Sequence, residues 1–275
     1  MIRQNAHKYS VSAMCAVLQI TRSTYYYEAT PRPINNTVEA AVVKIFEDNR
    51  RVYGTRKIKV ELNKLGMVIS RRRIGSLMKK NGLVSAYTVA QYKVHQSACN
   101  EAEVPNALNR QFQKQTPLEA VVSDLTYVRV AGKWNYICLL IDLFNRKIIG
   151  HSCGPAKDAN LVFRAFSKVK GNLNNIQLFQ TDRGREFKND LIDKVIETFK
   201  IKRSLSMKGC PYDNAVSEAT CKLVKSEFVN HRYFQTLEQL KSELDQYVHW
   251  FNEKRIHSTL GYLSPYQFKA LNKTV

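Results

Sequence analysis

Three segments in the first third of the chain repeat apolar residues at the spacing of one helix face. They span residues 37–51, 54–66 and 70–82, and the last two each end at a glycine, a common C-terminal signal of an α-helix. The third segment opens with three basic residues, Arg71, Arg72 and Arg73. Short helices joined by a turn, with a basic second helix, are typical of a helix-turn-helix. An ordinary basic helical bundle is the alternative.

Strand-like patterns replace the helical spacing after residue 117. Alternating or continuous apolar runs predict five strands, at 118–130, 133–144, 146–154, 175–182 and 201–206. Helical spacing predicts four helices, at 158–172, 188–200, 214–228 and 236–255. Three strands come first, and each later strand follows a helix. This order predicts a mixed α/β sheet, with an antiparallel meander followed by strands that are joined through helices.

These patterns divide the chain into four parts. We expect a short N-terminal helical segment at 1–35, a helix-turn-helix-like DNA-binding domain at 36–98, a linker at 99–117 and an α/β core with C-terminal helices at 118–275. The linker is assigned because its residues are polar and show no periodicity.

The chain carries a strong positive charge. Its 43 Lys and Arg residues, against 23 Asp and Glu residues, give a formal net charge of +20. Such a balance is typical of proteins that bind a polyanion, most often nucleic acid. The basic residues also cluster, as in RRVYGTRKIK at 50–59. A basic surface that only keeps the protein in solution is the alternative.

Composition argues against a membrane protein and against a structural zinc site. No apolar stretch approaches the roughly 20 residues that span a bilayer, and the N-terminus lacks the apolar segment of a signal peptide. The six cysteines form no C-x-x-C pair, and no histidine pair has zinc-finger spacing. We therefore expect a cytoplasmic protein with no membrane partner, associated with the nucleoid when it binds DNA.

Three carboxylates mark the α/β part of the chain. Asp182 ends the fourth predicted strand, Asp124 lies within the apolar first strand, and Glu218 lies on the helix 214–228. A carboxylate in an apolar run needs a partner, because an unpaired buried charge is costly. The three can meet at one edge of the sheet and hold two Mg²⁺ ions, which prefer anionic oxygen ligands. Each alone also has an ordinary interpretation: a core aspartate, a helix cap or a solvated charge.

Basic residues accompany Glu218 on its helix. Lys222 and Lys225 follow it at helical spacing and share its face. We expect another face to pack on the sheet through an apolar stripe, formed by Val216, Ala219 and Leu223. The lysines then guide DNA toward the carboxylates or are simply solvated.

Two arginines flank the turn that follows Asp182. Gly184 lets the chain turn there, and Arg183 and Arg185 lie on either side of it. Both side chains either approach DNA phosphates or stay in solvent.

Longer motifs carry a resemblance to a known family. They are YGTRKIKVELNKLGMVISRRRIGSLMKKNGL, VVSDLTYVRV, FQTDRGREF, GCPYDNAVSEATCKLVKSE and WFNEKRIHSTLGYLSPYQF. These segments resemble the helix-turn-helix, catalytic and closing motifs of insertion-sequence transposases of the IS-three family, OrfB type, in the DDE transposase and retroviral integrase superfamily. The resemblance covers nearly the whole chain. It departs at Gln180-Thr181, where the family commonly has His-Ser.

The resemblance implies an RNase H-like mixed-sheet catalytic core behind a small helix-turn-helix domain. It implies that Asp124, Asp182 and Glu218 are the catalytic metal ligands, with two Mg²⁺ ions per active site and Mn²⁺ as a substitute. It also places Lys225 beside the DNA of the element's end. The other candidate DNA contacts come from their positions in the sequence: Lys222, Arg71, Arg72, Arg73, Arg183 and Arg185.

We therefore expect a DNA transposase that cuts the ends of an insertion sequence and joins them to another strand by metal-dependent phosphoryl transfer. Its expected partners are terminal inverted repeats, target DNA and further copies of this chain, since two DNA ends must be held together. The resemblance also implies an upstream OrfA-type DNA-binding product, fused to this chain by frameshift. Two alternatives stay open: a nuclease on the same fold, and a DNA-binding regulator without catalysis.

Overall fold

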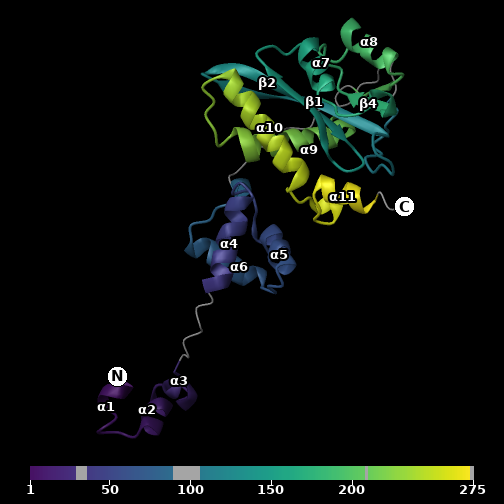
Figure 1. The fold of residues 1–275 in the computed structure, drawn as a ribbon. Coiled ribbons are helices and arrows are strands. Elements are labelled where there is room, and N and C mark those ends of the chain that lie inside the picture. The colour runs from purple at the N-terminus through teal and green to yellow at the C-terminus, as the bar shows by residue number, and fades with distance from the viewer. Residues whose placement is uncertain (29–35, 89–105, 208–209, 273–275) are drawn as a thin grey trace. The chain divides into compact units, whose positions relative to one another are not determined.

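The computed structural model describes residues 1–28, 36–88, 106–207 and 210–272. The chain divides into two compact units, Met1–Glu39 and Ala40–Val275 (Figure 1). The first unit contains three short helices, α1 (Ile2–Asn5), α2 (Val11–Val17) and α3 (Arg22–Tyr26). Ser10 and Thr21 cap the last two helices, because each side chain accepts a backbone hydrogen bond from the first turn.

Three further helices follow, and they confirm the helical spacing seen in the sequence. They are α4 (Asn36–Asp48), α5 (Thr55–Lys64) and α6 (Arg71–Lys80). Each buries its apolar stripe, through side chains such as Phe46, Leu62 and Ile74. Ser70 caps α6, since its hydroxyl accepts a hydrogen bond from the Arg73 N–H at 3.2 Å.

A five-stranded sheet with strand order β3-β2-β1-β4-β5 forms the centre of the α/β part. The strands are β1 (Ala120–Val130), β2 (Lys133–Asp142), β3 (Ile148–Gly154), β4 (Leu178–Thr181) and β5 (Lys202–Leu205). β1 pairs antiparallel with β2, and β2 with β3, whereas β4 runs parallel to both β1 and β5. The predicted mixed sheet is confirmed, and β1 lies in its middle.

Helices cover both faces of this sheet (Figure 1). They are α7 (Ala159–Ser167), α8 (Asp190–Thr198), α9 (Ala215–Val224) and α10 (Leu237–Glu253), while α11 (Pro265–Leu271) packs on α10. Short 3₁₀ turns occur at Ala86–Thr88, Leu173–Asn175, Pro211–Asn214 and Ser258–Leu260. α7 and α8 enclose the main apolar core with sheet residues such as Val121, while α9 packs on β1 and α10 on β3. Within the described ranges, no helix has both the length and the apolarity needed to cross a bilayer.

The region after α9 differs from the single α-helix predicted at 214–228. α9 ends at Val224, and a π-helical turn covers Lys225–Val229. Inside this turn the buried Glu227 binds Arg255, whose Nη2 lies 2.6 Å from Glu227 Oε1. The two residues lie 28 positions apart. Helical periodicity does not report such a tertiary contact, which explains why the prediction was wrong here.

The expected linker at 99–117 falls outside the described residues up to position 105. Beyond that point, Leu108 is buried, and its N–H donates to Ser204 Oγ on β5 at 3.2 Å. Arg110 forms an ion pair with the buried Asp213, with 2.7 Å between Nε and Oδ1. These contacts hold residues 108–110 against the edge of the sheet. The domain borders stay predictions.

Candidate active site

Asp124, within β1, and Asp182, just after the end of β4, lie at the same level of two neighbouring parallel strands. Their strands, β1 and β4, pair through Val122 and Gln180, and each aspartate follows this pair by the same number of residues. Asp182 stands directly after Thr181, the last residue of β4. The parallel pairing therefore brings together two carboxylates that are far apart in the sequence.

Helix α9 carries Glu218 to the same region. Cys221, one turn after Glu218, donates a thiol hydrogen bond to Asp124. This contact fixes the side of α9 that faces β1. Asp124, Asp182 and Glu218 each keep part of their surface exposed, so their oxygens stay accessible from solvent.

The stripe of α9 that packs on the sheet is not the predicted one. Its buried residues are small and mainly polar: Ser217, Thr220, Cys221 and Val224. The residues expected there are half-buried or exposed: Val216, Ala219 and Leu223. Ser217 and Thr220 satisfy their hydroxyl groups inside the helix, by donating to the Asn214 and Val216 carbonyls at 2.9 and 2.8 Å. Small side chains of this kind allow a helix to lie close to a sheet.

The three carboxylates influence one another's ionisation. The pKa of Asp124 is raised to about 6, first by burial and then by the negative charges of Asp182 and Glu218. Hydrogen bonds from the Leu125 N–H and the Cys221 thiol oppose this shift. Burial also raises the pKa of Asp182 and that of Glu218. Nowhere in the described part of the chain do three Asp, Glu, His or Cys side chains form a complete metal-binding group. The three carboxylates therefore lie in one region, but their oxygens do not surround a single metal position.

Lys157 and Glu186 also belong to this region, although the sequence did not single them out. Glu186 is buried, and its Oε1 lies 2.8 Å from Lys157 Nζ. Burial has the largest effect on the pKa of Asp182 and raises it, whereas a hydrogen bond from the Gly184 N–H lowers it. The negative charge of Glu186 raises this pKa further, and the positive charge of Lys157 lowers it. The sequence offered no signal for this pair, because its two residues lie far apart in the chain.

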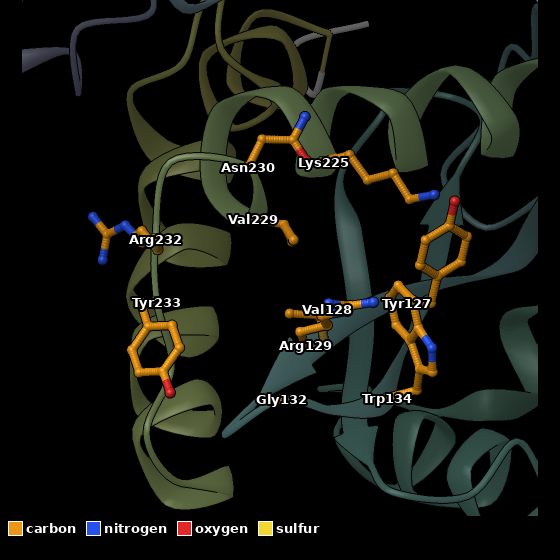
Figure 2. A pocket seen from close by; sticks show the side chains of 10 residues that line it. All are labelled: Tyr127, Val128, Arg129, Gly132, Trp134, Lys225, Val229, Asn230, Arg232 and Tyr233. Atoms are coloured by element: carbon orange, nitrogen blue, oxygen red, sulfur yellow. The ribbon is translucent and has the colours of Figure 1, made fainter. Parts of the chain in front are cut away.

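Lys222 and Lys225 leave the helix in different surroundings. Lys222 is exposed, and its charge lowers the pKa of Glu218 against the larger effect of burial. Lys225 begins the π-helical turn, and its Nζ lies 3.4 Å from the centre of the Tyr127 ring on β1. Figure 2 shows this ammonium group next to the ring. The structure thus brings Lys222 near a carboxylate and Lys225 onto an aromatic surface.

The predicted arginines fall into two groups. Arg183 donates from Nε to the Ser206 carbonyl at 3.0 Å, whereas Arg185 is exposed. The others form the first turn of α6, and all three are exposed: Arg71, Arg72 and Arg73. The helix-turn-helix arginines therefore present a separate basic surface.

Models of known families match three segments of the chain. A family model described as "Integrase core domain" matches residues 114–211, and a second with the same description matches residues 218–272. A model described as "HTH-like domain" matches residues 33–91. The two integrase matches contain all three carboxylates of the candidate site.

Several curated relatives are transposases. The chain is 32% identical to the "Probable transposase for insertion sequence element IS1353" of Shigella flexneri, over 92% of this chain and 50% of that protein. It is 28% identical to the transposase of IS904 from Lactococcus lactis, over 88% and 98%. It is 26% identical to transposase InsF of IS3A from Escherichia coli, over 98% of each. The chain thus spans about half the length of the first relative and nearly all of the others.

Solved structures also include similar folds. The catalytic core domain of HTLV-2 integrase, in complex with magnesium, aligns with a TM-score of 0.45 and 15% identity, over 55% of this chain and 96% of that chain.

A mixed sheet of this order, with helices on its faces and an HTH-like domain before it, defines an integrase-core polynucleotidyl transferase. The chain carries integrase core matches and is similar over most of its length to insertion-sequence transposases, those of the IS3 type among them. The predicted resemblance to this family, the fold class and the enzyme class are confirmed. Enzymes with this core depend on divalent metal.

Proposed function

We propose that Asp124, Asp182 and Glu218 are the catalytic residues of this transposase and hold two Mg²⁺ ions, for which Mn²⁺ is a substitute. One observation carries the proposal. Two aspartates lie at the same level of neighbouring parallel strands, and Cys221 of α9, one turn from Glu218, interacts with Asp124.

The donor set fits a hard divalent cation. All three side chains offer anionic oxygen, which Mg²⁺ prefers. Their raised pKa values reflect burial and, for Asp124, mutual repulsion with Asp182 and Glu218. A bound cation lowers such pKa values and favours the ionised carboxylates. When bound, the ions supply stabilisation of the negative charge that develops during phosphoryl transfer.

The basic residues orient DNA in this proposal. Lys222 and Lys225 bind the backbone of the element's end, close to Glu218. The exposed first turn of α6 binds phosphates elsewhere on the DNA, through Arg71, Arg72 and Arg73. Arg183 and Arg185 contact the DNA strand that passes the end of β4.

The activity is cleavage at the ends of an insertion sequence, followed by transfer of the freed strand. The substrates are terminal inverted repeats and target DNA. Because two ends must be held together, further copies of this chain assemble on the paired DNA. An upstream OrfA-type product, fused by frameshift, is the proposed protein partner, and the complex acts in the cytoplasm at the nucleoid.

Conservative substitutions test the three carboxylates. Asp124→Asn, Asp182→Asn and Glu218→Gln each remove one negative charge and keep the shape of the side chain. Each variant should lose cleavage of end DNA in Mg²⁺, while gel-shift affinity for the same DNA and the melting temperature stay near native. Glu238→Gln is the matched control, because this glutamate is 77% exposed and lies on α10. Near-native cleavage by any one variant would remove that residue from the site.

The products distinguish the two alternatives. A nuclease on this fold would cut end DNA and release it without joining it to a second strand. A regulator would bind end DNA and leave it uncut in Mg²⁺ and in Mn²⁺. Strand-transfer products formed by the purified native chain would contradict both alternatives.

A further inference from the structure

An open cleft lies between the β1–β2 hairpin and the chain that follows α9 (Figure 2). Its volume is about 640 Å³. Three aromatic and three basic side chains dominate its lining: Tyr127, Trp134, Tyr233, Arg129, Lys225 and Arg232. The cleft is therefore both aromatic and cationic.

The aromatic rings of this cleft are unusually accessible. Trp134 is 50% exposed, Tyr127 is 53% exposed and Tyr233 is 73% exposed. The Tyr127 and Trp134 rings lie 5.1 Å apart with 89° between their planes, so they form a corner. Grouped exposed aromatic side chains mark binding surfaces. A flat ring can stack on one wall of such a corner and meet the edge of the other.

The charge of the cleft favours an anion. Arg129 lies over the Trp134 ring at 4.5 Å, and Lys225 over the Tyr127 ring at 3.4 Å. Arg232 is already paired with Glu243. No acidic side chain lines the cleft in the described part of the chain. A nucleotide, which joins a flat base to a negatively charged phosphate, matches these walls.

The position of the cleft connects it to the candidate active site. Tyr127 follows Asp124 on β1 by three residues, a rise of about 10 Å along a strand, and its side chain leaves the opposite face of the sheet, where Lys225 reaches its ring. Lys225 follows Glu218 by about two helical turns. A DNA strand that reaches the carboxylates therefore passes close to this cleft.

We propose that the cleft binds an unpaired nucleotide of the DNA strand at the cut end. The base stacks in the Tyr127–Trp134 corner, and Arg129 and Lys225 neutralise the attached phosphate. The occupant is unpaired because the bases of a duplex have both faces covered by their neighbours, whereas a displaced base offers a free face. This inference rests on the proposed function, since it takes DNA as the substrate.

Intrinsic fluorescence tests the inference directly, because the chain has two tryptophans. Trp250 is 7% exposed, and its Nε1 finds no hydrogen-bond partner among the described residues. Trp250→Phe keeps an aromatic ring at this buried position, gives up no hydrogen bond of the side chain to the described residues, and leaves Trp134 as the single reporter. The probes are a blunt DNA duplex and the same duplex with a short 5′ thymidine overhang, both without divalent metal so that no cleavage occurs.

The overhang should quench the Trp134 emission and bind about tenfold more tightly than the blunt duplex. In the native background, Trp134→Ala and Tyr127→Ala should lose this preference while affinity for the blunt duplex changes little. Trp134→Phe keeps a ring and should retain most of the preference. Tyr266→Ala is the matched control, since this tyrosine is 58% exposed on α11. Equal binding of both duplexes by the native chain, or an unchanged preference in Trp134→Ala, would overturn the inference.

The proposed function and this inference are tested by separate measurements, so either can be wrong while the other holds. Glu218→Gln should keep the overhang preference, because the binding is measured without metal. If the carboxylate variants still cut DNA, the catalytic assignment falls and the fluorescence result stands. If Trp134→Ala behaves as native while the carboxylate variants are inactive, only the cleft assignment falls.

Discussion

Gly184 shows how a single position shapes the candidate site. Its N–H donates to Asp182 Oδ1 at 2.9 Å. A Cβ atom at position 184 would lie 2.4 Å from Glu186 Oε1, far inside normal contact distance. Because glycine has no side chain, the buried Glu186 and its partner Lys157 can lie close to Asp182.

Gly184→Ala should therefore destabilise the fold by about 1–3 kcal/mol, as expected when an extra atom is forced into a packed site. It should also lower DNA cleavage, because the displaced Glu186 changes the charge around Asp182. Gly75→Ala in α6 is the control, since its added Cβ meets only Thr55 Cγ2 at 3.7 Å. Urea unfolding measures both variants, and equal stabilities would show that the Glu186 carboxylate moves aside freely.

His257 is buried in surroundings that disfavour the protonated, positively charged ring. Burial, together with the positive charges of Arg255 and Lys57, lowers its pKa to about 2. Arg255 donates from Nη1 to His257 Nδ1 at 3.2 Å, which the neutral ring accepts. The unfolded ring binds a proton near pH 6.5, so unfolding takes up a proton between these two values.

The stabilising effect of a neutral His257 is therefore complete above about pH 6.5 and is lost as pH falls below it. Relative to His257→Gln, the native chain should lose up to about 1.4 kcal/mol of unfolding free energy per pH unit between about pH 6 and pH 5. Comparing the two chains removes the contribution of the carboxylates, which is the same in both. Their raised pKa values make the fold more stable, not less, as pH falls. Parallel stability curves for the two chains would contradict this account.

At the element scale, the π-helical turn after α9 is held by a buried polar network. Glu227 accepts hydrogen bonds from Arg255 and from the Tyr247 hydroxyl at 2.9 Å. Tyr87 also binds Glu227, and Arg255 Nη2 donates to the Tyr87 hydroxyl at 3.0 Å. This network fixes the turn that begins with Lys225, so it positions that lysine at the aromatic cleft.

Glu227→Gln should cost about 3–5 kcal/mol, because it leaves the buried Arg255 without its counter-charge. The matched control is Glu47→Gln, which removes the partner of Arg51 from an exposed pair and should cost less than about 1 kcal/mol. Chemical unfolding compares them. Similar small losses in both would mean that the turn does not depend on the pair.

The first turn of α6 should bind DNA phosphates. Replacing Arg71, Arg72 and Arg73 by Ala together should reduce the slope of log affinity against log salt by about 0.9 for each phosphate that an arginine no longer neutralises. Three exposed lysines around α8 provide the charge-matched control: Lys188, Lys194 and Lys200. An unchanged slope in the arginine variant would place the DNA elsewhere.

Local patterns predicted most elements, because helical and strand periodicity record which face is buried. They failed where a tertiary contact decides the outcome. The π-helical turn depends on Arg255, and the sheet-facing stripe of α9 depends on its close approach to β1. α11 was missed although Ser264 and Gln267 form a capping box before its apolar residues. In the candidate site, Asp124, Asp182 and Glu218 came from position and resemblance, whereas Lys157 and Glu186 emerge only from the three-dimensional structure.

At the scale of the whole molecule, the second unit carries both an HTH-like region and an integrase core. Polar contacts join the two regions, since the Ile256 N–H donates to the Tyr53 hydroxyl at 3.0 Å and Arg255 binds Tyr87. The HTH-like region and the integrase core thus share polar contacts through Arg255, the residue that also holds the turn with Lys225.

Anomalous diffraction from crystals grown with Mn²⁺ tests the three carboxylates as metal ligands, because it locates the metal independently of activity. Two manganese peaks should lie between Asp124, Asp182 and Glu218, with loss of at least one peak in Glu218→Gln. Manganese peaks held by other side chains, such as Glu186, or no peak beside Asp124 and Asp182, would contradict this assignment.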